Sequence, residues 1–249
     1  MTWLEAVGVL LAGMAAGTVN TIVGSGTLVT FPTLLALGFP PVVANVSNTV
    51  GLVPGSLSGA IGYRRELAGQ RSRLLRLGAA SLLGGLGGGI LLLILPAAVF
   101  DAVVPALILL GCALVVAQPW VSRKVAVPRD GPAHGSVWIW LLVFAAGVYG
   151  GYFGAAQGVL LVAILGIGLA ETMQRINAAK NVLALIVNSV AALLFIAVAE
   201  VDWRAAGLIA TGAVVGGQIG ATVGRRLSPL VLRAVIVVVG VVAAVDMLR

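Results

Sequence analysis

Long apolar runs alternate with short polar gaps along most of this chain. A helix needs about 20 apolar residues to cross a lipid bilayer, and six runs are long enough to do so. They cover 43–62, 74–95, 98–119, 176–199, 204–224 and 229–248. Two more apolar stretches, 3–38 and 137–169, are interrupted near their middle, at Asn20–Gly26 and Gly150–Gly158. We expect each of these to form a hairpin of two short helices, so the pattern predicts an all-α polytopic membrane protein.

The two halves of the chain repeat each other at a nearly constant spacing. Three pairs of matching segments lie 130, 133 and 132 residues apart, which indicates a duplicated unit of about half the chain. The pairs are AAGTVNTIVGSG at 15–26 with AAGVYGGYFGAAQG at 145–158, Asn48 with Asn181, and LLGGLGG at 82–88 with VVGGQIG at 214–220. Paired broken hydrophobic segments at corresponding positions are typical of the binding site of a secondary transporter.

These repeats predict the domain organisation. Residues 1–119 form a first membrane repeat and residues 137–249 form a second, both within one integral membrane domain. The hydrophilic segment 120–136 joins them as a linker. Glycines also recur every four residues in both halves, for example Gly84 with Gly88 and Gly212 with Gly216. Such small-residue faces allow membrane helices to pack closely, and we interpret most of these glycines in that way.

Composition and charge place the chain in the membrane and orient it. Hydrophobic residues make up 60% of the chain and charged residues only 9%, against about 25% charged in a soluble domain. The net charge of +7 lies in short gaps between apolar runs, as in cytoplasmic loops rather than nucleic-acid surfaces. Placing residues 64–76, the linker, Arg175 and residues 225–233 inside puts 12 of 15 basic residues in the cytoplasm. We therefore expect a multi-pass protein of the cell (inner) membrane with a cytoplasmic linker 120–136.

The same orientation predicts inverted repeats. The number of crossings is consistent only if 3–38 and 137–169 each return to the side on which they began. Each half then has one hairpin and three crossings, so the second half enters the membrane from the opposite face. This arrangement suits alternating access around a site near the middle of the bilayer.

Three segments closely resemble the sulfite exporter TauE/SafE family. They are GTVNTIVGSGTLVTFPTLLALGFPPVVANVSNTV at 17–50, the PGSxSGxxxYRR pattern at 54–65, and GxYGGYFGAAQG at 147–158. The resemblance covers nearly the whole chain and implies a membrane carrier for small organic or sulfur-containing anions, such as sulfite or sulfonates. The family usually shows Gly-Gly-Gly where this chain has Gly24-Ser25-Gly26, a departure that adds a hydroxyl group at the first break.

The candidate anion-binding residues lie at the two breaks and on the helices that follow them. Amides and the backbone N–H groups of broken helices can donate to oxyanions, and a cation within the membrane is a functional-site hypothesis by default. The alternative for Lys180 is that it snorkels to the headgroups, and the alternative for the breaks is a tight turn buried in protein. The predicted set is Asn20, Thr21, Gly24, Ser25, Gly26, Asn45, Asn48, Thr49, Gly151, Gly154, Gln157, Asn177, Lys180 and Asn181.

Missing residue types exclude several functions. An enzyme within the membrane would need a nucleophile with a base, or a metal cluster, and the chain has one His, one Cys and no carboxylate in the middle of a crossing. A carboxylate proton relay is excluded for the same reason; if transport is linked to protons, Lys180 or the substrate must carry them, and uniport stays open. We therefore predict a secondary transporter of a small anion, with no metal, no cofactor and no nucleic-acid partner. The alternative is an anion channel with the same broken-helix pore, and a homodimer is an arrangement that the sequence leaves open.

Overall fold

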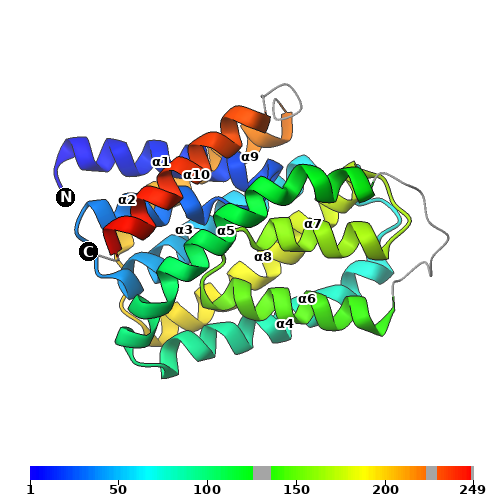
Figure 1. The fold of residues 1–249 in the computed structure, drawn as a ribbon, viewed down its shortest axis with the longest axis horizontal. Helices are drawn as coiled ribbons and strands as arrows, with labels where there is room; N and C mark the ends of the chain where they lie inside the picture. Colours follow the sequence, from blue (N-terminus) through cyan, green and yellow to red (C-terminus); the bar gives the residue numbers. More distant parts are fainter. Residues whose placement is uncertain (126–135, 223–228, 248–249) are drawn as a thin grey trace.

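The computed structural model describes residues 1–125, 136–222 and 229–247, and within them every regular element is an α-helix (Figure 1). The first half contains α1 (Trp3–Ile22), α2 (Thr27–Ala36), α3 (Pro41–Gly62), α4 (Arg71–Ile94) and α5 (Ala97–Val125). The second half contains α6 (Val137–Tyr152), α7 (Gln157–Gly168), α8 (Met173–Val198), α9 (Trp203–Thr222) and α10 (Pro229–Met247). The prediction of an all-α protein is confirmed for the described residues.

The predicted crossings correspond to six of these helices. α3, α4, α8, α9 and α10 match the predicted runs to within three residues at each end. α5 is longer than predicted, because it ends at Val125 and so enters the segment that we assigned to the linker. An apolar window marks only the part of a helix suited to lipid, whereas a helix can continue past it. Residues 126–135 of the predicted linker, with Arg225 and Arg226, lie outside the described residues.

Each interrupted apolar stretch forms two helices, but of unequal length. α1 has 20 residues and α2 has 10, while α6 has 16 and α7 has 12. At 1.5 Å per residue α1 is about 30 Å long, so it is not the short helix that we expected. Five described helices are long and apolar enough to cross a membrane: α1, α4, α5 over Ala97–Trp120, α8 and α9. The chain is a multi-pass membrane protein by this measure.

The two breaks have the same backbone design. At the end of α1 the N–H groups of Val23 and Gly24 both donate to the carbonyl of Val19, at 2.7 and 3.0 Å, and Gly24 has φ +90°. At the end of α6 the N–H groups of Phe153 and Gly154 both donate to the carbonyl of Tyr149, at 3.0 and 3.1 Å, with Gly154 at φ +78°. A glycine in the left-handed region is a common way to end a helix.

The two halves pack against each other in a reciprocal way. α1 packs on α9 of the second half, and α6 packs on α4 of the first. Small residues permit both contacts: a Cβ at Gly84 would lie 2.3 Å from the carbonyl oxygen of Phe144, and one at Gly216 would lie 2.0 Å from that of Met14. The interpretation of these glycines as packing residues is confirmed. In Figure 1, α1 begins at the left end of the molecule and α6 begins at the right end, so the two helices run in opposite directions.

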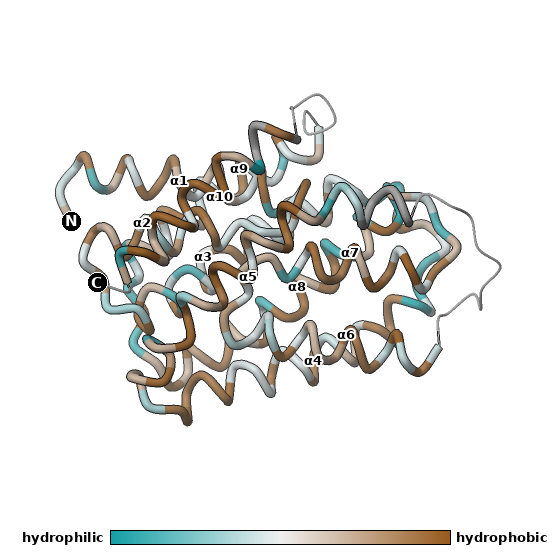
Figure 2. The backbone as a smooth tube through the Cα atoms, viewed as in Figure 1, coloured by the Kyte–Doolittle hydropathy of each residue, from teal (hydrophilic) through white to brown (hydrophobic). Residues whose placement is uncertain are grey.

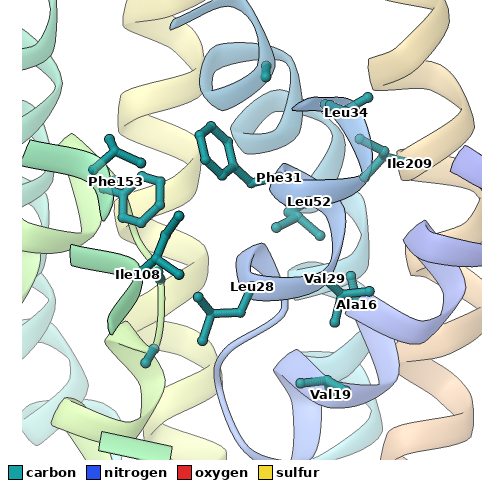
Figure 3. Packing of buried hydrophobic residues seen from close by; sticks show 14 of the residues in the cluster. Ala16, Val19, Leu28, Val29, Phe31, Leu34, Leu52, Ile108, Phe153 and Ile209 are labelled. Carbon is teal, nitrogen blue, oxygen red and sulfur yellow. The ribbon is translucent and has the colours of Figure 1, made fainter. Parts of the chain in front are cut away.

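Aromatic side chains hold the breaks in the core. Phe31 on α2 points at Phe153 in the second break (Figure 3), with ring centroids 5.1 Å apart and planes at 87°. Phe100 on α5 packs against both rings, at 6.4 and 6.0 Å. Many large apolar side chains, such as Leu75, Ile94 and Leu193, are exposed on the outside instead. Figure 2 shows brown, apolar stretches along many of the helices, interrupted by paler and teal segments.

Candidate functional site

The two breaks touch each other through their backbones. The N–H of Gly158 donates to the carbonyl of Gly24 at 2.9 Å. A Cβ at Gly24 would lie 2.4 Å from the Cα of Gly158, and a Cβ at Gly158 would lie 2.4 Å from the Cα of Gly24. Neither position has room for a side chain. The candidate residues of the first and second repeats are therefore brought together at this contact.

Two polar side chains beside the contact are buried without a partner. Ser25 lies in the first break and Gln157 is the first residue of α7 after the second break, and they are 0% and 3% exposed. Within the described residues, Ser25 Oγ and Gln157 Nε2 have no hydrogen-bond partner. The Gln157 amide packs on Gly150, where a Cβ would lie 2.3 Å from Gln157 Cδ. Since buried polar groups are nearly always paired, two free donors at one contact indicate a place for a polar ligand or water.

Three donors from α8 converge on the end of α1. The Lys180 ammonium donates to the carbonyls of Asn20 and Thr21, at 2.8 and 3.0 Å. The amides of Asn177 and Asn181 also donate to the Thr21 carbonyl, at 3.4 and 3.5 Å. The last carbonyls of a helix have no partner within it and carry its negative end. α8 thus stabilises the broken end of α1 with one charge and two amides.

Lys180 does not snorkel. Its side chain is 0% exposed, and it lies seven residues into α8, about 10 Å from the start of that helix. No carboxylate of the described residues forms an ion pair with it. Its aliphatic stem covers Gly158, since a Cβ there would lie 3.0 Å from Lys180 Cδ. Lys180 therefore contacts both breaks, its ammonium the first and its stem the second.

α3 makes the corresponding contacts with the second break. Asn45, the counterpart of Asn177 at a spacing of 132 residues, donates to the carbonyl of Tyr152 at 3.0 Å. Its Oδ1 has no partner in the described parts of the chain. Asn48 is satisfied within the first half, because Thr30 donates to its Oδ1 and its Nδ2 donates to Thr27 Oγ1 at 3.3 Å.

Four other predicted residues shape the backbone rather than present side-chain donors to the contact. The Thr49 hydroxyl donates to the Asn45 carbonyl one turn back, at 2.9 Å. A Cβ at Gly151 would lie 2.2 Å from the Gly85 carbonyl oxygen, so Gly151 packs against α4. Gly26 precedes α2, and Gly154 provides the left-handed turn before α7.

Several residues of this region were not predicted. Thr27 and Thr30 hold Asn48, and Tyr63 accepts a hydrogen bond from Asn177 Nδ2 at 3.2 Å. Ser56 on α3 accepts hydrogen bonds from Asn20 and Asn188, at 3.3 and 3.2 Å. Asn188 thus links α8 to α3. Ser56 and Tyr63 belong to the PGSxSGxxxYRR segment, which we used only for the resemblance.

An ionic network joins the two halves near the start of α8. The Glu171 carboxylate pairs with Arg73 of α4 at 2.8 Å and with Arg175 of α8 at 2.6 Å. Arg175 also donates to the carbonyl of Ala68 at 3.0 Å. Burial raises the pKa of Glu171, but the hydrogen bonds and charges of Arg175 and Arg73 outweigh this effect and hold its pKa below the usual value. The network ties α8 to the loop before α4.

Comparison with known proteins identifies the family of the chain. Residues 9–247 match the sulfite exporter TauE/SafE family. The chain is similar to the probable membrane transporter protein YfcA of Escherichia coli K12, with 26% identity over 94% of this chain and 86% of the relative. It is also similar to the probable membrane transporter protein ORF9 of a Sinorhizobium species (25% identity, 96% and 90%) and to a probable membrane transporter protein of Haemophilus influenzae (24%, 91% and 88%). The chain therefore belongs to the TauE/SafE family of membrane transporters.

Proposed function

We propose that the protein is a secondary transporter that moves a small anion across the cell membrane by alternating access. The anion binds where the two breaks meet, near the middle of the bilayer. Ser25 and Gln157 donate to it from the two breaks, and Lys180 supplies positive charge. The remaining predicted residues form the walls of this site or hold the helix ends that build it.

The arrangement of the helices supports inverted repeats in the membrane. α1 and α6 run in opposite directions, and the packing of α1 on α9 is repeated by that of α6 on α4 (Figure 1). In this proposal 1–119 and 137–249 are the two repeats, and 3–38 and 137–169 each return to the side from which they entered. The linker 120–136 is then cytoplasmic. A rocking motion of one repeat against the other would expose the central contact to each side in turn.

One observation carries the proposal: Ser25 in the first break and Gln157 next to the second each have a buried polar atom without a partner among the described residues, beside the contact of the breaks. A hydroxyl and an amide N–H₂ are donors, and the nearby ammonium of Lys180 adds charge, so the matching ligand is an oxyanion. The description of the family as sulfite exporters favours sulfite or a sulfonate within that class.

Counterflow in proteoliposomes tests this function. We expect unlabelled sulfite or methanesulfonate inside the vesicles to accelerate uptake of the same labelled anion, because a carrier returns faster when loaded. Uptake that is rapid but insensitive to internal anion would indicate a channel instead. Gln157→Ala should slow counterflow at least about tenfold, since loss of a donor to an anion costs about 1.5–3 kcal/mol. Gln174→Ala, at an exposed position on α8, is the matched control and should transport normally.

A further inference from the structure

Lys180 is a buried cation that has only neutral partners. Its ammonium donates to two backbone carbonyls, which leaves one N–H of three available. No described residue offers it a carboxylate within ion-pair distance. The aliphatic stem of Lys180 covers Gly158, which is part of the contact between the breaks. The free donors Ser25 and Gln157 lie beside the same contact.

The helices around α8 add no negative charge near this ammonium. α8 packs against α3, α4, α6 and α7, and α7 carries no ionisable residue. Tyr63 is bonded to Asn177, Tyr149 donates to the Ala155 carbonyl, and Arg73 is paired with Glu171. The ionisable groups on these helices and at their ends, with that of α8 itself, are Tyr63, Arg71, Arg73, Arg76, Tyr149, Tyr152, Glu171, Arg175 and Glu200, and α1, which Lys180 contacts, carries Glu5. Two arginines already hold Glu171. Glu200 and Glu5 lie toward the far ends of α8 and α1, about 30 Å along α8 from Lys180 and about 22 Å along α1 from Asn20.

Burial makes the charge of Lys180 depend on what occupies the site. An ammonium without a counter-ion is strongly disfavoured in a medium of low dielectric constant, and two neutral carbonyls offset this only in part. An anion bound at the contact of the breaks would supply the missing negative charge. Anion binding and protonation of Lys180 then favour each other, and this coupling is necessarily reciprocal.

The geometry points to Lys180 as the proton carrier of a proton-coupled anion transporter. This inference rests on the proposed function and names its coupling ion. On one side of the membrane Lys180 Nζ takes up a proton as the anion binds. Both cross in the loaded carrier, and on the other side the anion leaves and Nζ releases the proton. The empty carrier returns with a neutral amine, so one proton crosses with each monovalent anion.

The residue type and its place suit this role. A lysine can lose its proton when buried, whereas an arginine stays charged in proteins. Its hydrogen bonds reach the first break and its stem covers the second. A change in its charge therefore acts on the contact between the two repeats, which alternating access must rearrange.

The test uses a sulfonate and a trapped pH dye. Methanesulfonate stays ionised near neutral pH, so any proton that moves with it must be carried by the protein. We expect an inward methanesulfonate gradient to acidify the lumen of wild-type proteoliposomes, and an alkaline lumen to drive its accumulation. A potential set with potassium and valinomycin should not change the rate. Absence of counterflow for every anion tested would remove the proposed function itself. Counterflow without proton movement, or accumulation driven by the potential, would overturn the coupling alone.

Variants then decide whether Lys180 carries the proton. Lys180→Arg keeps the charge permanently, so we expect it to retain anion counterflow and lose accumulation driven by the pH gradient; persistence of that accumulation would overturn the assignment. Lys180→His offers a second titratable group with a lower pKa, and the pH optimum of accumulation should move toward acid. An unchanged optimum would also overturn it. Lys124→Gln, at the only other lysine of the chain, should behave as wild type.

Discussion

The two breaks have the same backbone conformation but differ in the side chains that donate hydrogen bonds to them. At each break two N–H groups donate to one carbonyl of the preceding helix, and a glycine takes a left-handed conformation. Each break also accepts a hydrogen bond from an asparagine on a helix of the other half. Asn177 reaches the end of α1 and Asn45 reaches the end of α6, and they occupy equivalent places in the repeats. Among the described residues, a charged side chain, that of Lys180, donates to the first break only.

This difference shows how a duplicated unit can build an asymmetric site. At spacings of 132 and 133 residues the counterparts of Lys180 are Asn48 and Ser47. Asn48 is bonded within its own half, and Ser47 accepts the N–H of Asp202 at 2.9 Å. In the proposed site, the shape therefore comes from features that the two halves share, whereas the charge comes from one position at which the halves differ.

The largest effects should come from removing the shared feature, the glycine contact. Gly24→Ala and Gly158→Ala each place a methyl group within 2.4 Å of the opposite backbone. We expect Gly158→Ala to destabilise the protein by about 1–3 kcal/mol through overpacking, and Gly24→Ala by about 2–5 kcal/mol, because its left-handed φ adds about 1–2 kcal/mol. Thermal unfolding in detergent measures this. Gly8→Ala, where a Cβ meets nothing within 4 Å, is the control. Equal stability of Gly8→Ala and Gly158→Ala would refute the contact.

Removing the two corresponding asparagines should have different effects on stability at the two breaks. Asn45 is buried and is the side-chain donor on the Tyr152 carbonyl, so Asn45→Ala should cost about 1–3 kcal/mol. Asn177→Ala should cost less than about 1 kcal/mol, since Lys180 and Asn181 still donate to the Thr21 carbonyl. Unfolding temperatures of the two variants, measured side by side, test this order. A larger loss of stability in Asn177→Ala than in Asn45→Ala would mean that the hydrogen bonds of Lys180 do not stabilise the first break.

The ionic network of Glu171, Arg73 and Arg175 should contribute a pH-dependent stability of intermediate size. Because the folded-state pKa of Glu171 is lowered, its contribution to stability is present above the ordinary pKa of a glutamate and is lost as the pH falls through the lowered value. Glu171→Gln should cost about 1 kcal/mol at neutral pH and flatten the decline of stability in acid. Unfolding scans from neutral to acidic pH measure both. Parallel curves for wild type and variant would contradict the role of this carboxylate.

The smallest change in stability is expected at Ser25. Its hydroxyl has no partner within the described residues, so Ser25→Ala should alter stability by no more than about 0.5 kcal/mol. Competition in the counterflow assay should nevertheless shift in favour of other anions, because a donor to the ligand is lost at one break only. Unchanged competition among sulfite, methanesulfonate and acetate would show that Ser25 does not contact the ligand.

Much of the fold was determined by local features of the sequence. Apolar runs predicted the bounds of five long helices to within three residues, whereas α5 extends six residues past its run. Of the six predicted crossings, α4, α5, α8 and α9 are long and apolar enough to cross a membrane, because the length of a membrane helix follows from the lipid it must span. The breaks were visible as glycines among polar residues, since a helix ends where a residue such as Gly24 or Gly154 can take positive φ. The sequence matched Asn48 with Asn181, whereas the contacts in the structure make Asn45 the counterpart of Asn177.

Only the tertiary structure decided which groups of the candidate site form hydrogen bonds with one another. Whether Lys180 pointed to headgroups or inward could not be read from its distance to Arg175, because both directions suit a lysine near a helix end. Its partners are the backbone carbonyls of Asn20 and Thr21. Every residue has a carbonyl, so the sequence does not show which carbonyls can accept. That depends on where the helix ends and which side chains of other helices face its last turn. The same holds for Glu171, whose partner Arg73 is 98 residues away. The sequence alone determined which segments enter the membrane and where they break. The packing of α8 across those breaks determined which polar groups are satisfied and which stay free for a ligand, since hydrogen bonding depends on positions that only the assembled helices define.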